Sequence, residues 1–530
     1  MFDLIILNGK VIDGTGSPEQ KLDIAVKDGR IVEIGLLGDA ISKEAFDAEG
    51  LYVTPGFIDM HSHSDYTLLL DGKAESFVRQ GVTTEVIGNC GLSCTPFKSL
   101  EHLKRNVFCH VEGYRPEWKN SKDYFDDLQN RPLGINVVPL TGHAAIRSYV
   151  MGFENREASS SEIQSMKRLL EESMECGSFG FSTGLEYFPG NSADRKEIFG
   201  LCDIVKRYDG LYATHVRNRD EQYQKGYGEA FDTANKTGVR LQISHAVPKY
   251  GAPEEATEWV LDRMHHYGSS LDMACDVIPY EWGPTTMTAI LPNELLRNRP
   301  DQIAKLLRDK SVRDSVRNQK KPFWLLIRDD KWDEILLYHT VKSPEFKGMT
   351  FQKIGNALHI DPFDAMMDLL IAEGSDMFGA LMMGKIKSKK NIASFLKLGQ
   401  AGVISDGVSL SDKGPLRHIR WSPGCYGWVP RFLDEYVSNT GLLTLQEAIH
   451  RITGLPAKRL GLKKRGLLKK DFKADITVFS KEDFKESPST TGYNQFASGI
   501  KLVIIGGGIV IRDDCHSGAY KGIVLKKHID

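Results

Sequence analysis

The stretch Pro55-Gly56-Phe57-Ile58-Asp59-Met60-His61-Ser62-His63 joins a short apolar run to two histidines that are separated by one residue. On a β-strand, side chains at i and i+2 point to the same face, so His61 and His63 would lie side by side where the run ends. Neutral imidazole is a common metal ligand, and such a pair suits one metal ion or the start of a two-metal site. The alternative is a coincidental polar pair at the start of a loop, and the rest of the chain has to decide between them.

Short apolar runs alternate with helix-like segments through the middle of the chain. Eight runs can be counted, and this number and rhythm are typical of an α/β protein with a (β/α)8 barrel of the TIM type. The runs are Phe57–His61, Thr83–Cys90, Ile135–His143, Phe179–Tyr187, Leu211–His215, Leu241–His245, Leu271–Tyr280 and Gly402–Asp406. The helix-like segments include Ser160–Cys176, Gln222–Thr237, Glu254–Tyr267 and Thr444–Ile452. We therefore expect a barrel over residues 55–464.

Both ends of the chain show a different pattern, in which short apolar runs are separated by Gly and Asp turns. Residues 3–54 have the pattern of antiparallel hairpins, and it returns at Ala474–Phe479 and Lys501–Ile511. We expect residues 1–54 and 465–530 to build one small β-sandwich domain together.

Residues from about 285 to 355 interrupt the repeat after the seventh run. They contain apolar runs of their own, Phe323–Ile327 and Ile335–Tyr338. Insertions at the βα loops of a barrel often cover or shape the site at its mouth. We expect an inserted subdomain at this position, and an insert remote from the site is equally compatible with the sequence.

Composition limits the class of function. The chain has 530 residues, of which 41% are hydrophobic and 26% charged, which is ordinary for a globular protein with a sizeable core. A formal net charge of -2 gives no general attraction for nucleic acids or anionic membranes, so we expect a small-molecule substrate. We find no signal-peptide pattern, no long apolar window and no Cys-x-x-Cys pair among the eight cysteines. A cytoplasmic protein with reduced thiols is expected, and the oligomeric state stays open.

Two more histidines lie at the ends of separate runs, where barrel enzymes place their sites. His215 ends the fifth run, and His245 ends the sixth run, about one βα unit later. Either one alone would be interpreted as a hydrogen-bonded core histidine. At equivalent strand ends, and together with His61 and His63, they favour metal ligation.

A cysteine and an aspartate at strand ends fit the same site. Cys90 ends the run that directly follows the one carrying His61 and His63, so its thiolate would lie beside the metal as a bridging or terminal ligand. Asp406 ends the eighth run, where a carboxylate can take a proton from metal-bound water and pass it to a leaving nitrogen. The alternatives are inert packing for the cysteine and a turn or helix cap for the aspartate.

Motifs along nearly the whole chain form one ordered set. They are Pro55–His63, Gln80–Thr84, Gly88–Gly91, Thr141–His143, Arg147, Val150–Gly152, Phe181–Tyr187, Thr214–Asn218, Ile243–His245 and Ser405–Gly407. This set resembles the amidohydrolase superfamily, and more closely its D-aminoacylase branch, the N-acyl-D-amino-acid deacylases. The fourth run, Phe179–Tyr187, contains no lysine, so the chain is similar to the members that use a thiolate instead of a carboxylated lysine.

The resemblance implies a barrel with a small β-domain made from both chain ends. It also implies zinc-dependent hydrolysis of the amide bond of N-acyl-D-amino acids, which releases a D-amino acid and a carboxylate through attack of metal-activated water. The implied roles are a tight zinc site at Cys90, His215 and His245, a weaker second site at His61 and His63, and a general acid/base at Asp406.

The residues expected near the substrate match the family less well. Tyr187 fits the aromatic hydroxyl that the family uses near the substrate carboxylate, and Arg217 or Lys249 would supply a cation for it. We expect His143, at the end of the third run, to have a positioning role beside the substrate rather than to bind metal.

Two alternatives stay open because the seventh run departs from the family. Where D-aminoacylases often have Tyr-Pro-Tyr followed by Ser, this chain has Ile278-Pro279-Tyr280 and then Gly283-Pro284. The same mechanism acting on a cyclic amide, a lactam or a modified D-peptide is one alternative. A catalytically silent assembly or binding protein is another, although all five expected ligands and Asp406 are present.

Overall fold

A ring of parallel strands forms the centre of the molecule, in a computed structural model that describes residues 1–38, 40–111, 113–487 and 495–529. The strands are β6 (Phe57–Asp59), β7 (Val82–Ile87), β8 (Asn136–Pro139), β9 (Thr141–Gly142), β10 (Gly180–Gly184), β11 (Leu211–His215), β12 (Arg240–Ile243), β13 (Met273–Val277) and β17 (Ala401–Val403). One sheet has the order β17-β13-β12-β11-β10-β9, and the other has the order β6-β7-β8. The two sheets are joined by backbone hydrogen bonds, from Phe179 N to Pro139 O (2.8 Å) and from Asp406 N to His61 O (3.1 Å).

The expected α/β class is confirmed, and the two parallel sheets are consistent with the barrel expected from the eight runs. Each run overlaps one of these strands, and the third run contains both β8 and β9. Strands β7, β10, β11 and β13 are buried at every position, as parallel strands are when both of their faces are covered. Because the chain leaves all of these strands at the same edge, the residues that follow them meet at one end of the barrel.

Helices pack around the barrel. The expected helices are confirmed with slightly shorter bounds as α6 (Ser160–Glu175), α8 (Tyr223–Thr237), α9 (Ala256–Tyr267) and α18 (Leu445–Arg451). In α6, Ser159 and Glu162 form a capping box, and Met166, Leu170 and Met174 lie on the buried face. The others are α1 (Thr67–Leu70), α2 (Glu75–Val78), α3 (Leu100–Asn106), α4 (Ser121–Gln129), α5 (His143–Met151), α7 (Arg195–Arg207), α16 (Lys389–Leu396), α17 (Gly424–Leu433) and α19 (Gly454–Leu460).

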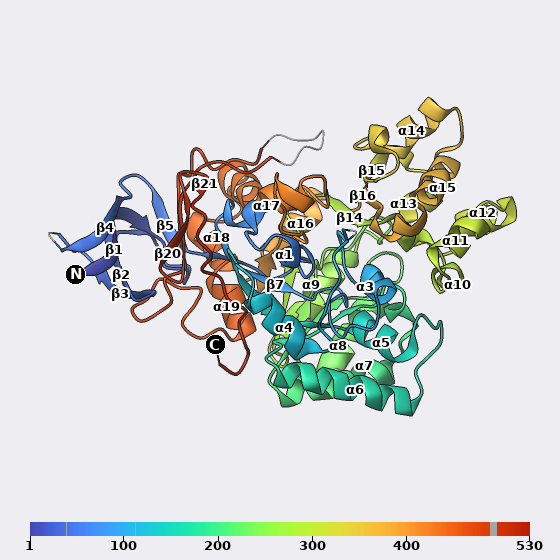
Figure 1. Cartoon of the computed structure of the whole chain (residues 1–530), viewed down its shortest axis with the longest axis horizontal. Coiled ribbons are helices and arrows are strands. Elements are labelled where there is room, and N and C mark those ends of the chain that lie inside the picture. Colours follow the sequence, from blue (N-terminus) through green and yellow to red (C-terminus); the bar gives the residue numbers. More distant parts are fainter. Residues whose placement is uncertain (39, 112, 488–494, 530) are drawn as a thin grey trace.

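Both ends of the chain build one nine-stranded sheet, on the left in Figure 1. Its strands are β1 (Phe2–Val11), β2 (Gln20–Lys27), β3 (Arg30–Gly35), β4 (Ser42–Asp47), β5 (Tyr52–Pro55), β18 (Ile476–Phe479), β19 (Ile500–Ile505), β20 (Gly508–Arg512) and β21 (Cys515–His516). The expected antiparallel hairpins are present as β1-β2 and β2-β3, whereas β4 and β5 pair with β1 in parallel. Strand β18 pairs with β5, so both chain ends contribute to one apolar core that includes Ile6, Val53, Ile476 and Ile504.

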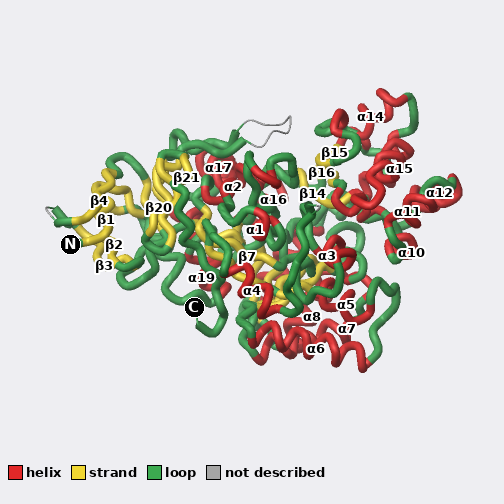
Figure 2. Tube along the Cα trace, viewed as in Figure 1, coloured by secondary structure: helices red, strands yellow, loops and turns green. Residues whose placement is uncertain are grey.

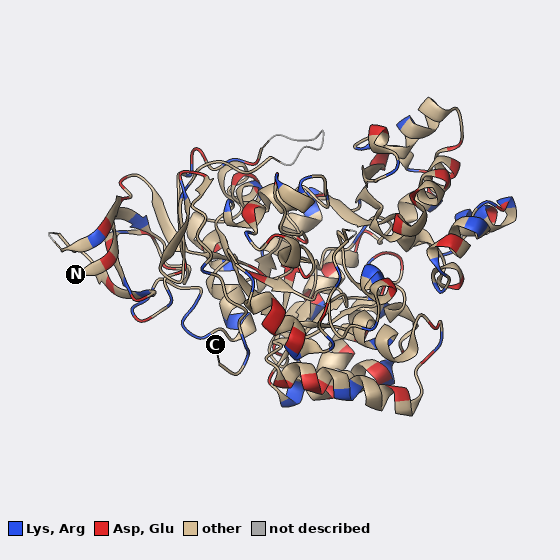
Figure 3. Ribbon diagram, in the orientation of Figure 1, with Lys and Arg blue, Asp and Glu red and all other residues tan. Residues whose placement is uncertain are grey.

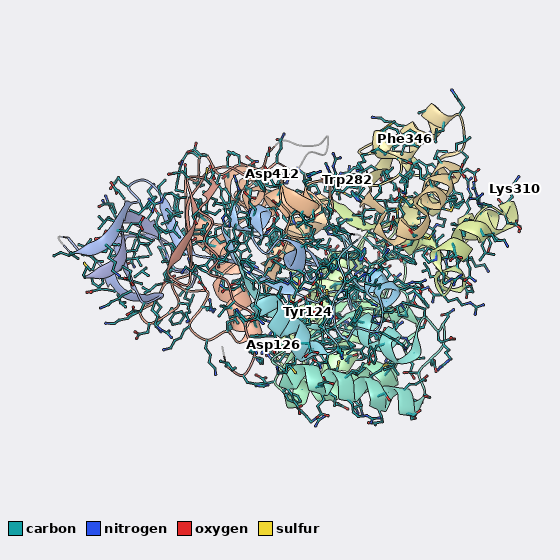
Figure 4. All side chains as sticks on the ribbon, in the orientation of Figure 1. Tyr124, Asp126, Trp282, Lys310, Phe346 and Asp412 are labelled. Carbon is teal, nitrogen blue, oxygen red and sulfur yellow. The ribbon has the colours of Figure 1, made fainter. Side chains whose placement is uncertain are left out.

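The insert after the seventh strand has its own sheet, in the order β14-β16-β15. Its elements are β14 (Trp282–Thr286), α10 (Asn293–Leu296), α11 (Pro300–Leu306), α12 (Lys310–Arg317), α13 (Leu325–Arg328), β15 (Ile335–His339), α14 (Phe351–Leu358), α15 (Pro362–Glu373) and β16 (Leu381–Lys385). Its apolar core runs from Met287 to Ile386, beyond the expected limit at 355, because β16 pairs with both β14 and β15 and closes the sheet. In Figure 4, Trp282 marks the inner end of the insert, and Lys310 and Phe346 lie further out.

The terminal domain and the insert differ in secondary structure, and positive and negative side chains are interspersed on the surface of the molecule. Figure 2 shows mainly strands in the terminal domain and mainly helices in the insert. Lys and Arg are mixed with Asp and Glu along the outer helices α6 and α12 (Figure 3), in keeping with a net charge of -2. Within the described residues, no helix combines the length and the apolar character needed to cross a membrane.

Candidate active site

Cys90 lies among three histidines at the carboxyl end of the barrel strands. Its Sγ atom is 3.3 Å from Nε2 of His61, 3.4 Å from Nε2 of His245 and 3.8 Å from Nδ1 of His215. The four residues stand at or just after the ends of β6, β7, β11 and β12, and each is at most 4% exposed. The structure thus brings together four of the five expected ligands around one point.

The fifth expected ligand lies beside this cluster. Nε2 of His63 is 3.2 Å from Oδ1 of Asp406, and Nε2 of His61 is 3.5 Å from the same oxygen. Two groups of ligand atoms result, His61 with Cys90 and His245, and His61 with His63 and Asp406, and within each group all atoms lie within 4.8 Å of one another. His61 belongs to both groups, which suits two neighbouring metal positions.

The donor set fits a transition-metal ion. A thiolate with imidazole nitrogens suits zinc, copper or iron, whereas calcium and magnesium prefer oxygen ligands. The Nδ1 atoms of His61, His63 and His245 are buried and have no hydrogen-bond partner among the described residues. These three rings present Nε2, not Nδ1, to Cys90 or Asp406, so the support for a metal is the grouping of the thiol, the Nε2 atoms and the carboxylate.

Three of the site residues have left-handed backbone conformations. The φ angles are 50° at Cys90, 35° at His245 and 47° at Asp406. Such a conformation costs of order 1–3 kcal/mol in a residue other than glycine and persists only where the surroundings enforce it. Here Asp276 accepts the backbone N–H of His245, and Asp59 accepts that of His61 over 3.2 Å. Buried carboxylates below the site therefore fix the turns that carry the ligands.

Glu186, a carboxylate that was not predicted as a site residue, contacts the side of the His215 ring that faces away from Cys90. Oε2 of Glu186 is 2.8 Å from Nε2 of His215, which leaves Nδ1 of this ring facing Cys90. Burial raises the pKa of Glu186, but the charge of Lys249 and the hydrogen bond with His215 outweigh it and lower the pKa to about 2. Glu186 directly precedes Tyr187 in a motif of the fourth run, so its position at a strand end was the available signal.

Burial sets the protonation of the imidazoles. It lowers the pKa of His61 to about 3 and that of His215 to about 4, so both rings are neutral at pH 7. Burial also raises the pKa of Asp406, but the hydrogen bond with His63 and the nearby His61 prevail and hold it below its ordinary value. The site therefore offers neutral imidazoles at His61 and His215 and ionised carboxylates at Glu186 and Asp406.

The family model described as "Amidohydrolase family" matches residues 44–282 and 403–511. The chain belongs to the amidohydrolase family. The unmatched segment between the two ranges contains the insert, while the matched ranges contain every expected metal ligand and Asp406.

Relatives of this amidohydrolase match it over its whole length. The D-aminoacylase of Alcaligenes xylosoxydans xylosoxydans is 29% identical over 532 residues, which cover 99% of this chain and 98% of the relative. The N-acyl-D-glutamate deacylase of Bordetella bronchiseptica, solved with zinc and a phosphonate that mimics the tetrahedral intermediate, has a TM-score of 0.82, 27% identity and 99% coverage of both chains. A D-aminoacylase structure concerned with its binuclear metal centre has a TM-score of 0.81 and 27% identity and covers 99% of this chain and all of that one. The protein is a metal-dependent hydrolase that acts on amide bonds.

Tyr187 joins the insert to the histidine cluster of the amidohydrolase. The Tyr187 ring packs against His215, with centroids 4.7 Å apart, and against Phe323 of the insert, with centroids 5.1 Å apart. A cavity of about 450 Å³ lies next to Glu186 and Phe323, between the barrel and the insert. The insert is therefore not remote from the histidine cluster, and the expected role of Tyr187 near the substrate carboxylate stays a prediction.

The two cations expected for the substrate carboxylate both form ion pairs with carboxylates. Lys249 is 4% exposed, and its Nζ contacts Glu186, Asp220 (3.2 Å) and the carbonyl oxygen of Phe323 (2.7 Å). The guanidinium of Arg217 donates to Glu229 over 2.7 and 2.9 Å and to two backbone carbonyls. Each side chain is paired with carboxylates from neighbouring elements, and the expected role of Arg217 or Lys249 at the substrate carboxylate stays a prediction.

His143 also lies outside the cluster. Its Nε2 is 2.6 Å from Oε1 of Glu197, which also binds Arg147, and all three side chains are buried. This ion network lies between α5 and α7 and not among the ligand groups around Cys90. The contacts of His143 place it in this buried network, and its expected positioning role beside the substrate stays a prediction.

Proposed function

We propose that this amidohydrolase hydrolyses the amide bond of N-acyl-D-amino acids and releases a D-amino acid and a carboxylate. The observation that carries the proposal is the convergence of Cys90 with His61, His215 and His245, with Asp406 beside them. The similarity of the whole chain to a D-aminoacylase and to an N-acyl-D-glutamate deacylase supports the substrate class.

The expected ligands would hold zinc in two positions. Cys90, His215 and His245 provide the thiolate and imidazole donors of a tight site, and His61 and His63 mark a weaker second one. When bound, zinc would supply Lewis-acid polarisation of the amide carbonyl and acidify the attacking water. Glu186 and the turns at Cys90 and His245 keep the donors in place.

Asp406 would move the proton that the reaction requires. Its Oδ1 atom lies 3.2 Å from His63 and 3.5 Å from His61, and its backbone carbonyl accepts a hydrogen bond of 2.7 Å from Trp421. As an ionised carboxylate it would take one proton from the attacking water and give it to the nitrogen as the carbon–nitrogen bond breaks. One water is consumed, and the products are an amine and a carboxylate.

A metal analysis coupled to a substrate screen tests the proposal. Zinc-loaded protein should hydrolyse N-acetyl-D-amino acids and leave the L-isomers largely intact. Asp406→Asn should retain its metal while kcat falls by about 10²- to 10⁴-fold, because a positioned acid/base group is lost. Asp412→Asn, an exposed position in the following loop that is labelled in Figure 4, is the matched control.

Three other outcomes would contradict the proposal. No turnover by zinc-loaded protein on a broad D-panel rejects this substrate class. Hydrolysis of cyclic amides, lactams or modified D-peptides in its place keeps the mechanism and changes the substrate. Metal binding without hydrolysis of any of these compounds favours the silent binding protein.

A further inference from the structure

Asp59 is a fully buried carboxylate at the end of β6. Its Oδ1 atom accepts the backbone N–H groups of His61 and Ser405, each over 3.2 Å, and its Oδ2 atom accepts the hydroxyl of Ser405. Among the described residues, the Asp59 side chain has no other hydrogen bond and no ion pair. A buried carboxylate is costly, and all the bonds that offset this cost go to these two residues. Asp59 therefore joins the segment that carries His61 to the segment that carries Asp406.

The hydroxyl of Ser405 extends this connection across the turn around Asp406. Besides its bond with the carboxylate, it accepts the backbone N–H of Gly407 over 2.8 Å. Backbone hydrogen bonds join the same turn to the segment after β6, from Asp406 N to His61 O (3.1 Å) and from His63 N to Gly407 O (2.7 Å). The residues on both sides of Asp406 are thus tied to the segment that carries the two histidines.

The turn needs this support because Asp406 has a left-handed backbone, with a φ angle of 47°. Such a conformation persists only where the surroundings enforce it. Space for the hydroxyl is also restricted, because a Cβ atom at Gly407 would lie only 3.0 Å from Oγ of Ser405. Held in this way, Oδ1 of Asp406 lies 3.2 Å from Nε2 of His63 and 3.5 Å from Nε2 of His61.

We propose that Asp59 and Ser405 are positioning residues for the reaction, because together they hold Asp406 at a fixed distance from the two histidines. The inference rests on the proposed function and adds the residues that orient its acid/base group. A group that transfers a proton has to stay within hydrogen-bond reach, and a displacement of about 1 Å can lower the rate by about 100-fold. Since both residues act through the position of Asp406, their effect depends on its carboxylate.

Kinetics of single and double variants test this dependence. In zinc-loaded Ser405→Ala we expect kcat for N-acetyl-D-amino acids to fall by about 10- to 100-fold, with KM within about twofold. Asp59→Asn keeps the shape of the side chain but replaces the acceptor of the Ser405 hydroxyl by a donor, and it should show the same split. In an Asp406→Asn background, either change should alter the remaining kcat by less than about twofold, because residues that act as a unit are not additive.

Thr340 of the insert provides a matched control. Its buried hydroxyl also donates to a carboxylate, that of Glu373, and also accepts a backbone N–H, that of Ser343 over 3.1 Å. Thr340→Val should therefore lose stability as Ser405→Ala does, but without a change in kcat. Thermal melts followed by circular dichroism measure the stability of each variant.

Two kinetic results would overturn the proposal. If Ser405→Ala lowers kcat as strongly in the Asp406→Asn background as in the wild type, the hydroxyl acts on the fold and not through Asp406. If kcat is unchanged in both Ser405→Ala and Asp59→Asn, the position of Asp406 does not depend on them. Should Ser405→Ala fail to fold, Asp59→Asn in the same two backgrounds decides.

A metal titration separates this proposal from the proposed function. His61, His63 and Asp406 form one of the two ligand groups, so a shift of Asp406 should also affect a second metal equivalent. We expect Ser405→Ala to bind the second equivalent of cobalt about tenfold less tightly and the first as the wild type does, and Thr340→Val to match the wild type in both. If the wild type hydrolyses no N-acyl-D-amino acid, the proposed function fails and this titration decides on the positioning role. Equal affinity of Ser405→Ala and the wild type for the second equivalent, or a single binding step in both, would then overturn it.

Discussion

The Oε2 atom of Glu186 lies 2.8 Å from Nε2 of His215, while Nδ1 of the same ring lies 3.8 Å from Sγ of Cys90. The imidazole is therefore held between a carboxylate and the ligand cluster. A carboxylate in this position fixes the tautomer and orientation of a ligating histidine and raises its basicity. Glu186 also binds Lys249, whose Nζ donates a hydrogen bond to the carbonyl oxygen of Phe323. Glu186 thus connects the ligand cluster to the insert.

Removing the charge of Glu186 should weaken the metal site. We expect Glu186→Gln to bind zinc about 10- to 100-fold less tightly, because the amide holds the ring less firmly and leaves it less basic. Titration with a competing chelator measures the affinity. Glu258→Gln, at an exposed position of α9, should leave it unchanged. Equal affinities in the two variants would mean that Glu186 does not support the metal.

Replacing the central thiol should have a larger effect. We expect Cys90→Ser to lower zinc affinity by about 100-fold or more, because a thiolate is a far stronger zinc ligand than a hydroxyl group. Cobalt-substituted protein should also lose its thiolate-to-metal absorption band. The exposed Cys515 provides the control, since Cys515→Ser should change neither readout. Persistence of the band in Cys90→Ser would exclude Cys90 as a ligand.

The contact between the insert and Tyr187 should affect substrate binding. Phe323 packs on Tyr187 and lies 4.7 Å from Nζ of Lys249, so Phe323→Ala removes part of the wall over the ligands. We expect KM to rise by about fivefold with a smaller change in kcat, because aromatic contacts of this kind are worth about 1 kcal/mol. Phe346→Ala, further out on the insert in Figure 4, should leave KM unchanged. If both variants raise KM equally, the insert affects substrate binding only through the stability of the fold.

The buried ion network around Glu197 should stabilise the fold. Glu197→Gln leaves Arg147 buried without its counter-charge, and we expect the free energy of unfolding to fall by about 3–5 kcal/mol. Glu171→Gln, which removes a surface ion pair with Arg207, should cost at most about 1 kcal/mol. Chemical unfolding at pH 7 followed by circular dichroism measures both. If both variants lose equally little free energy of unfolding, the ion network around Glu197 does not stabilise the fold.

The same network sets a pH dependence. Burial raises the pKa of Glu197, but His143 and Arg147 hold it below its ordinary value. The stabilisation by this carboxylate is therefore complete above the unfolded-state pKa of about 4.3 and is lost as the pH falls through the lower folded-state value. Between pH 5 and 3 the wild type should lose stability more steeply than Glu197→Gln.

Local pattern was sufficient to predict the parallel strands and the convergence of the expected metal ligands at their ends. The apolar runs that end in His61, Cys90, His215, His245 and Asp406 each overlap a strand of the parallel sheets. Because parallel strands in a barrel all end at the same rim, residues far apart in sequence could be assigned to one site from their place at a strand end. The pairing of β4 and β5 with β1 was not predictable, since the alternation of a strand does not specify its partner.

By itself, the sequence determined the class of fold and the ligands and acid/base group expected at the metal site, because these depend on periodicity and on residue type. Tertiary structure decided how the charged groups are paired. Arg217 and Lys249 meet carboxylates from other elements, and Asp59 meets the hydroxyl of Ser405. It also decided that Glu186 supports His215 and that the insert extends to Ile386. The physical reason is that the pairing of a charge depends on which side chains fold against it, and these come from distant segments that no local pattern connects.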